Sequence, residues 1–232
     1  MNDVQNIDLP MALESRKGRW YCERRSNFAD RSNHLARRSD HSRTELKGLV
    51  LDTATQIVAQ EGLNALTARK IASEIGYSPG SIYNVVEDLD ELIGLVNEGT
   101  MRRLNADLAA IEMTGNALAD AGQVLDVYIK FRNDHSGLWE ANLNHAVRKD
   151  VQQPAGYIEQ TEVSFEIAAR AIGPAFDGDA AKVQLAVRVL WASLQGIFSV
   201  SNSATVFQDG TDSQRQMADN LVETYLRGVA AG

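Results

Sequence analysis

The sequence has 232 residues, of which 44% are hydrophobic and 23% are charged, and this composition is typical of globular proteins rather than disordered or fibrous ones. Its length favours a small domain followed by a larger one. No stretch reaches the roughly 18 apolar residues of a membrane helix, and the first twenty residues lack the apolar run of a signal peptide. We therefore expect a cytoplasmic protein with no membrane partner. The single cysteine, Cys22, excludes an internal disulfide, and nothing beside it indicates a nucleophile.

The acidic residues lie mainly in the C-terminal part of the sequence. The net charge is −8, yet residues 1–47 contain 10 Lys and Arg against 7 Asp and Glu. Residues 1–43 are polar and arginine-rich without a sustained hydrophobic period, so we expect a disordered basic arm there. The arm is either a leader without a role or a flexible element that contacts DNA phosphates or the minor groove.

Three short helices are predicted after the arm. Apolar residues recur at three- and four-residue spacings over residues 45–61, 67–75 and 78–86. Thr67 is a suitable N-cap for the second helix, and Gly76 ends it. Ser78 and Pro79 form a typical helix start, because proline at the first helical position needs no N–H partner.

A long helix follows, because Asp88 and Glu91 have the spacing of a capping box and apolar residues then continue at helical spacing to Ile111. Five further helices are expected near residues 116–134, 137–149, 155–172, 179–203 and 212–230. The last two have wide apolar faces, which we interpret as the interface of a homodimer.

The predicted fold class is therefore all-α. We expect an N-terminal three-helix helix-turn-helix domain over residues 44–90, followed by a larger C-terminal helical bundle over residues 91–232 that binds a ligand and dimerises. The third short helix has small or hydrogen-bonding residues at its exposed positions, whereas Ile82 and Val85 are expected to face inward. Such a helix fits the major groove, since no bulky side chain holds it away from the base edges.

The segment from Thr67 to Tyr83 resembles the DNA-binding domain of the TetR family. It contains Thr, then Ile-Ala, then Gly-x-Ser-x-Gly-Ser-Ile-Tyr, and the close match covers residues 46–93. The resemblance implies double-stranded operator DNA as a partner and a small-molecule effector that releases a dimeric repressor from it. The residues that it implies for base contacts are Pro79, Gly80, Ser81 and Asn84. Those that it implies for phosphate contacts are Thr67, Ser78 and Tyr83.

Two positions depart from the family pattern. Val86 stands where the family usually has an aromatic residue, and Leu89 stands where it usually has a phosphate-binding lysine. The acidic residues around Leu89 are expected to repel DNA phosphates. Our hypothesis is that the basic arm, residues 1–43, supplies the missing cation.

The C-terminal body contains the materials of an apolar ligand pocket with a few polar groups. The residues that we expect near a ligand are Trp139, Phe165, Trp191 and Gln195. The segment Trp191-x-x-x-Gln195-Gly196 resembles the Trp-His-Gly motif of one C-terminal TetR subclass, with Gln195 in place of His. The alternative is that these aromatic residues belong to the core, where aromatics at helical spacing are common. His135 and His145 are ten residues apart and no carboxylate or Cys completes a ligand set, so we expect no metal and no cofactor.

Enzymatic function is not expected. The sequence has no Gly-rich phosphate loop, no nucleophile motif and no His, Asp and Glu cluster with usable spacing. The alternative to a DNA-binding regulator is a helical protein–protein adaptor with a degenerate DNA-binding face, because Val86, Leu89 and the acidic helix start weaken that face. Repressor and activator cannot be distinguished from the sequence, since both use the same helix-turn-helix.

Overall fold

The computed structural model describes residues 41–146, 152–200 and 211–230, and the chain from Arg43 onward forms one compact unit. The predicted arm falls outside the described residues up to residue 40, as do residues 147–149 and 201–203 of two predicted helices. The described ranges hold helices and no strand, so the predicted all-α class is confirmed. No helix within these ranges has the length and apolar character needed to cross a membrane.

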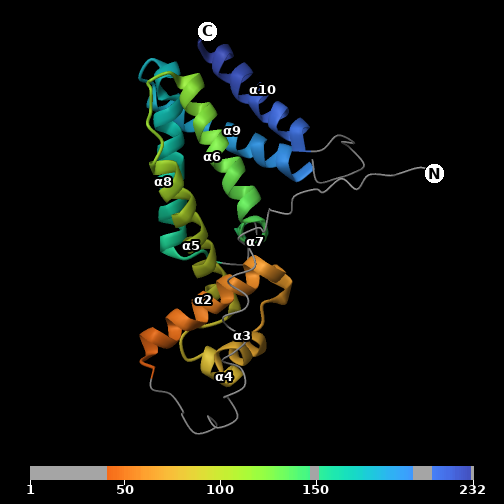
Figure 1. The fold of residues 1–232 in the computed structure, drawn as a ribbon. Helices are drawn as coiled ribbons and strands as arrows, with labels where there is room; N and C mark the ends of the chain where they lie inside the picture. Colours follow the sequence, from red (N-terminus) through yellow and green to blue (C-terminus); the bar gives the residue numbers. More distant parts are fainter. Residues whose placement is uncertain (1–40, 147–151, 201–210, 231–232) are drawn as a thin grey trace, which may run out of the picture. The chain divides into compact units, whose positions relative to one another are not determined.

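The helices follow one another with short connections (Figure 1). Their bounds are α2 Arg43–Glu61, η2 Leu63–Ala65, α3 Ala68–Ile75, α4 Pro79–Ile82, α5 Leu89–Ala109, α6 Ala117–Asp134, α7 Ser136–Ala146, α8 Ala155–Ile172, η3 Gly173–Phe176, α9 Ala180–Val200 and α10 Thr211–Ala230. The predicted starts of the long helix and of the five helices after it lie within one residue of these bounds. A capping residue, a proline or a turn in the sequence marks most of these starts.

The first hydrophobic core joins α2, α3, α4 and the start of α5. Val50, Ile71, Ile82 and Leu92 have no solvent-exposed surface, which is expected for the inward face of short amphipathic helices. The same cluster includes Leu138 and Ala141 of α7, a helix that lies much later in the sequence.

The rest of the described chain is a layered bundle in which α5 and α8 run side by side, α6 packs on both, α9 packs on α8, and α10 packs on α6 and α9 (Figure 1). One face of α7 packs on α2, and its backbone comes very close there. A Cβ placed on Gly137 would lie 2.7 Å from the Val58 carbonyl oxygen and 3.1 Å from that of Ala59. Only glycine therefore permits this close approach between α7 and α2.

Candidate DNA interface and effector cavity

The turn between α3 and α4 is fixed by local hydrogen bonds. The Oγ1 atom of Thr67 accepts from the Lys70 backbone N–H at 3.1 Å, which confirms Thr67 as the N-cap of α3. Gly76 follows α3 in the left-handed conformation, with φ +76°, and the next N–H, that of Tyr77, bonds to the Ala72 carbonyl at 2.8 Å. These bonds set the direction in which α4 leaves α3.

The third helix is shorter than the sequence pattern predicts. Its α-helical part is Pro79–Ile82, and hydrogen-bonded turns replace the helix as far as Val86, whose N–H bonds to the Ile82 carbonyl at 3.2 Å. Val85 and Val86 are buried in the first core. The chain turns inward at these β-branched residues, which have low helix propensity, instead of continuing an exposed helix.

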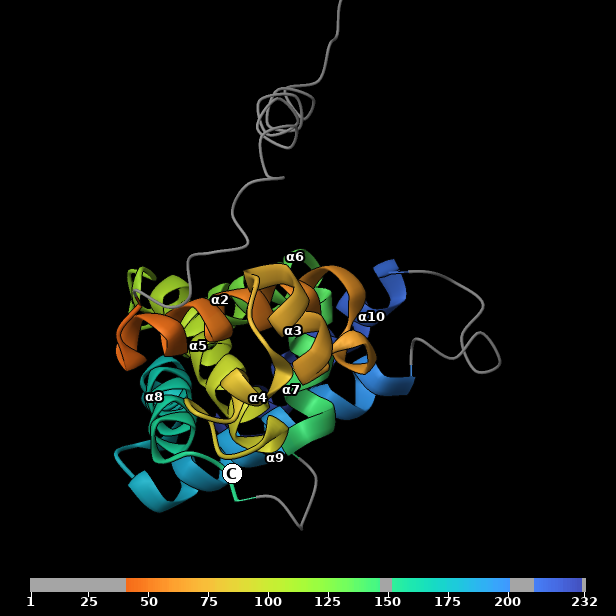
Figure 2. The same ribbon diagram turned by 90° about the horizontal axis from the view of Figure 1, so that it is seen from below.

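The residues predicted to contact DNA lie in α4 and directly beside it, apart from Thr67, which caps α3. Six of the seven are exposed, and Tyr83 has half of its side-chain surface open to solvent. Ser81 is half-buried, and its Oγ lies 2.8 Å from the Ser78 Oγ. Seen from below, α3 and α4 lie on the near side of the described chain, so no other described helix covers them (Figure 2).

The acidic start of α5 beside this surface is largely engaged within the protein. Asp88 caps the helix by accepting from the Glu91 N–H at 2.7 Å. The side chain of Glu91 accepts from the Glu87 N–H and lies 3.2 Å from the Lys47 Nζ. The Glu87 N–H lowers the pKa of Glu91 most, desolvation opposes it, and Lys47 lowers it further. Leu89 packs on the first core.

Lys47 is the functional candidate that the sequence analysis missed. It belongs to α2, and nothing in its local sequence indicates that it would reach the acidic start of α5, 44 residues later. Its side chain is 42% exposed, so a partly exposed cation lies beside the acidic start of α5, where the sequence alone shows only acids.

A cavity of about 440 Å³ lies in the bundle, within the range of small-molecule sites. Residues from α5 to α10 line it, and they include three of the four predicted ligand residues, namely Trp139, Phe165 and Trp191. Gln195 does not line the cavity. Its Nε2 donates to the hydroxyl of Tyr128 at 2.8 Å, and Tyr128 does line it. Gln195 therefore acts one layer behind the wall.

The polar groups of the cavity wall are few and neutral. They include Asn142, Thr161, Ser164 and Tyr128, and no charged side chain is among the described residues that line it. Burial raises the pKa of Tyr128 to about 12, so its hydroxyl stays protonated at neutral pH.

Helix α7 connects the cavity to the helix-turn-helix core. Trp139, Asn142 and Leu143 line the cavity, whereas Leu138 and Ala141 belong to the first core. This division follows from the helical repeat, which places neighbouring residues on different faces. A change in the position of α7 would therefore alter both the cavity and the packing beneath α2.

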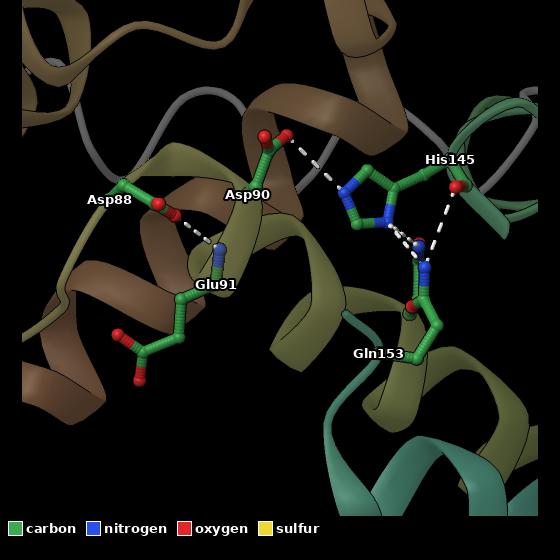
Figure 3. Close-up of polar contacts among 6 residues, drawn as sticks. Asp88, Asp90, Glu91, His145 and Gln153 are labelled. Atoms are coloured by element: carbon green, nitrogen blue, oxygen red, sulfur yellow. Dashed lines mark hydrogen bonds and ion pairs between the residues drawn. The ribbon is translucent and has the colours of Figure 1, made fainter. Parts of the chain in front are cut away.

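The far end of α7 carries a buried polar cluster at the start of α5 (Figure 3). His145 is 1% exposed, and its Nε2 lies 3.4 Å from an Asp90 carboxylate oxygen. Its Nδ1 faces the amide nitrogens of Asn97 at 3.4 Å and Gln153 at 3.5 Å. Because both amides are donors, Nδ1 is the acceptor and the ring proton lies on Nε2, toward Asp90. His145 has structural partners here, and no group of His, Cys, Asp and Glu in the described ranges is arranged to hold a metal ion.

Comparison with known proteins supports the assignment of the helix-turn-helix. The family model for bacterial regulatory proteins of the tetR family matches residues 50–84, which span most of α2, α3 and α4. Residues 50–84 therefore form a helix-turn-helix domain of the TetR type. This domain is the DNA-binding part of bacterial regulatory proteins, so the match indicates a DNA-binding regulator. No curated protein matches the sequence.

Solved structures show that the TetR fold extends through the C-terminal bundle. A protein of unknown function from Rhodococcus sp. RHA1 is 19% identical with a TM-score of 0.61, over 85% of this chain and 99% of that one. A TetR transcriptional regulator from the same organism is 15% identical with a TM-score of 0.58, over 78% and 97%. The multidrug binding protein EbrR, complexed with imidazole, is 19% identical with a TM-score of 0.55, over 81% and 96%.

Proposed function

We propose that the chain is a repressor that binds operator DNA through the surface around α4 and is released when a small molecule enters the cavity. The observation that carries this proposal is the double role of α7, whose residues Asn142 and Leu138 belong to the cavity wall and to the helix-turn-helix core respectively. A ligand that prefers one position of α7 shifts the equilibrium between DNA-binding and released forms. Residues 44–90 read DNA and residues 91–232 sense the effector. The similarity to EbrR supports a small-molecule effector.

The assignments on the DNA side come from the resemblance to the TetR helix-turn-helix. Pro79, Gly80, Ser81 and Asn84 contact base edges, while Thr67, Ser78 and Tyr83 contact phosphates. Six of these residues are exposed and Ser81 is half-buried, which supports the assignment. The basic arm of residues 1–43 adds phosphate contacts to this surface. Deleting residues 1–40 should lower the affinity for DNA and reduce its dependence on salt, whereas an unchanged affinity and salt slope contradicts the role of the arm.

The working form is a homodimer that pairs through α9 and α10. Leu185 and Val189 lie one turn apart on α9 and are 62% and 37% exposed, which is unusual for large apolar residues on one helix face and supports a covered face. Light scattering should give the dimer mass for the intact chain and the monomer mass for Leu185→Glu. A monomeric intact chain contradicts this assignment.

The experiment that tests the function is a gel shift with the DNA upstream of the protein's own gene. The intact chain should shift this DNA at low salt, and Tyr83→Ala should weaken binding about tenfold through loss of one phosphate contact. The exposed residue Ile158 of α8 offers a control, because Ile158→Ala leaves the DNA surface intact. Absence of any shift at low salt would favour the adaptor. A reporter gene under the same DNA distinguishes repression from activation.

A further inference from the structure

The lining of the cavity specifies the chemistry of its ligand. We propose that the effector is an uncharged, largely apolar molecule with a hydroxyl or N–H group that donates a hydrogen bond to the Oδ1 of Asn142. This inference rests on the proposed function, because it assigns a ligand class to the same cavity. It is carried by two separate observations, namely the absence of charge among the described lining residues and one buried acceptor without a partner.

The wall offers no counterion to a charged ligand. Transfer of an ion from water into an apolar site without a counterion is strongly unfavourable. Arg132 is the cation that acts on Tyr128, yet its guanidinium lies 4.7 Å from the centre of the Phe198 ring and donates to the Phe198 carbonyl at 3.3 Å. These contacts hold Arg132 outside the wall. An anion and a cation are therefore both expected to bind poorly.

The hydroxyl donors of two residues in the wall are engaged within the protein. Ser164 donates to the Oδ1 of Asn105 at 2.6 Å, and Thr161 donates to the Tyr157 carbonyl at 3.0 Å. A hydroxyl with a protein acceptor gains little from a ligand, because a new bond only replaces an existing one. Neither residue therefore selects for an acceptor on the ligand. The buried Trp139 Nε1 has no hydrogen-bond acceptor within the described residues, but its side chain interacts with the Tyr128 hydroxyl.

Asn142, in contrast, has an acceptor that no described residue engages. Its side chain is 3% exposed, its Nδ2 faces the Sδ of Met101 at 3.6 Å, and its amide also interacts with the Tyr157 hydroxyl. Its Oδ1 has no hydrogen-bond partner in the described part of the chain. Buried amide oxygens are rarely left unpaired, so a donor on the ligand completes this residue.

The test compares the binding of four pyrene probes to the full chain. 1-Pyrenemethanol carries a hydroxyl, 1-ethylpyrene has the same shape without a donor, and 1-pyrenecarboxylate and 1-pyrenemethylammonium carry opposite charges. Quenching of tryptophan emission by the pyrene reports binding, because Trp139 and Trp191 line the cavity. Trp20→Phe removes the one remaining tryptophan, so that the signal comes from the cavity.

We expect 1-pyrenemethanol to bind about tenfold more tightly than 1-ethylpyrene, through one additional hydrogen bond, and about 100-fold more tightly than either ion. Equal binding of the carboxylate overturns the proposal and assigns Arg132 as its counterion. Equal binding of the ammonium, equal binding of 1-ethylpyrene, or no binding of any probe also overturns it.

Two variants separate a direct contact from a structural role. Asn142→Leu should weaken 1-pyrenemethanol about tenfold and leave 1-ethylpyrene unchanged, because it removes the acceptor and retains the volume. Ser164→Ala is the matched control in the same wall, and it should preserve the preference for the alcohol. Loss of that preference in Ser164→Ala but not in Asn142→Leu contradicts the assignment. If Asn142→Leu does not fold, the four-probe comparison on the unchanged cavity decides alone.

Failure of this inference and failure of the proposed function give different results. If 1-pyrenemethanol binds with the expected preference but leaves the protein on DNA in the gel shift, the ligand class holds and effector release fails. If a charged probe binds most tightly and releases DNA, release holds and the ligand class is wrong.

Discussion

The helix-turn-helix core and the effector bundle are packed in opposite ways. Val50, Ile71, Ile82 and Leu92 of the first core are fully buried, and Thr67, which caps α3 beside this core, is exposed. The bundle instead contains a cavity of about 440 Å³ with an unpaired amide oxygen in its wall. A closely packed core holds a DNA-reading surface in one geometry. In a core that contains a cavity, a bound ligand can supply packing contacts and thereby stabilise the protein. Within one chain, the DNA-reading region is therefore closely packed, whereas the effector bundle contains unfilled space.

The largest expected effect comes from the same truncation made in both regions. Leu92 and Leu104 lie on α5 and are 0% and 2% exposed, but Leu104 lines the cavity. Leu92→Ala should lower the free energy of unfolding by about 3–5 kcal/mol and Leu104→Ala by about 2–3 kcal/mol, because Leu104 has packed neighbours on fewer sides. Urea unfolding followed by circular dichroism measures both. Equal losses would show that the cavity wall is as tightly packed as the first core.

Replacement of a small residue by a larger one should change the free energy of unfolding in opposite directions in the two regions. Ala72 is buried in the first core, and Ala168 lines the cavity. Ala72→Leu should lower the free energy of unfolding by about 1–3 kcal/mol through overpacking. Ala168→Leu should raise it by about 0.5–1 kcal/mol by filling space, and should abolish binding of pyrene probes. Thermal unfolding checks the stability, and destabilisation by Ala168→Leu contradicts the hollow bundle.

A smaller effect is expected at the N-cap of α3. Thr67→Ala removes the acceptor of the Lys70 N–H and should cost about 1 kcal/mol of unfolding free energy, while Thr67→Ser retains it. The same pair of variants is measured in the gel shift. If the serine variant is stable but binds DNA as weakly as the alanine variant, the methyl group and not the hydroxyl serves the DNA surface.

The smallest effect is a pH dependence at the acidic start of α5. The pKa of Glu91 lies below its ordinary value of 4.5, first because of the Glu87 N–H. A lowered carboxyl pKa gives stability that is present above the unfolded value and lost as the pH falls through the folded one. Glu91→Gln should therefore be less stable than the intact chain at pH 7, by under about 1 kcal/mol at this partly exposed site. The difference should vanish in acid, and a constant difference across pH contradicts the linkage. Lys47→Met should reduce this difference in stability, because Lys47 also lowers the pKa of Glu91.

The two regions also differ in how far the sequence predicts them. The turn at Gly76, the cap at Thr67 and the start at Ser78 are local signals, so the helix-turn-helix was placed correctly apart from the length of α4. The end of α4 depends on burial of Val85 and Val86, which is a tertiary effect. In the bundle, the sequence indicates aromatic pocket residues, but the layer in which Gln195 lies depends on Tyr128, 67 residues away. The pairing of Lys47 with Glu91 is similarly long-range.

The close contact at Gly137 restricts how the sequence of α7 can change among relatives of this regulator. Residues of α6, α8 and α9 that line the cavity can change with a new ligand, because none of them belongs to the first core. Helix α7 lacks this freedom, since its backbone lies against the Val58 and Ala59 carbonyl oxygens and any side chain at position 137 would push it away. Among relatives with the same DNA specificity and different effectors, variation should therefore concentrate on α6, α8 and α9, while glycine persists at this crossing.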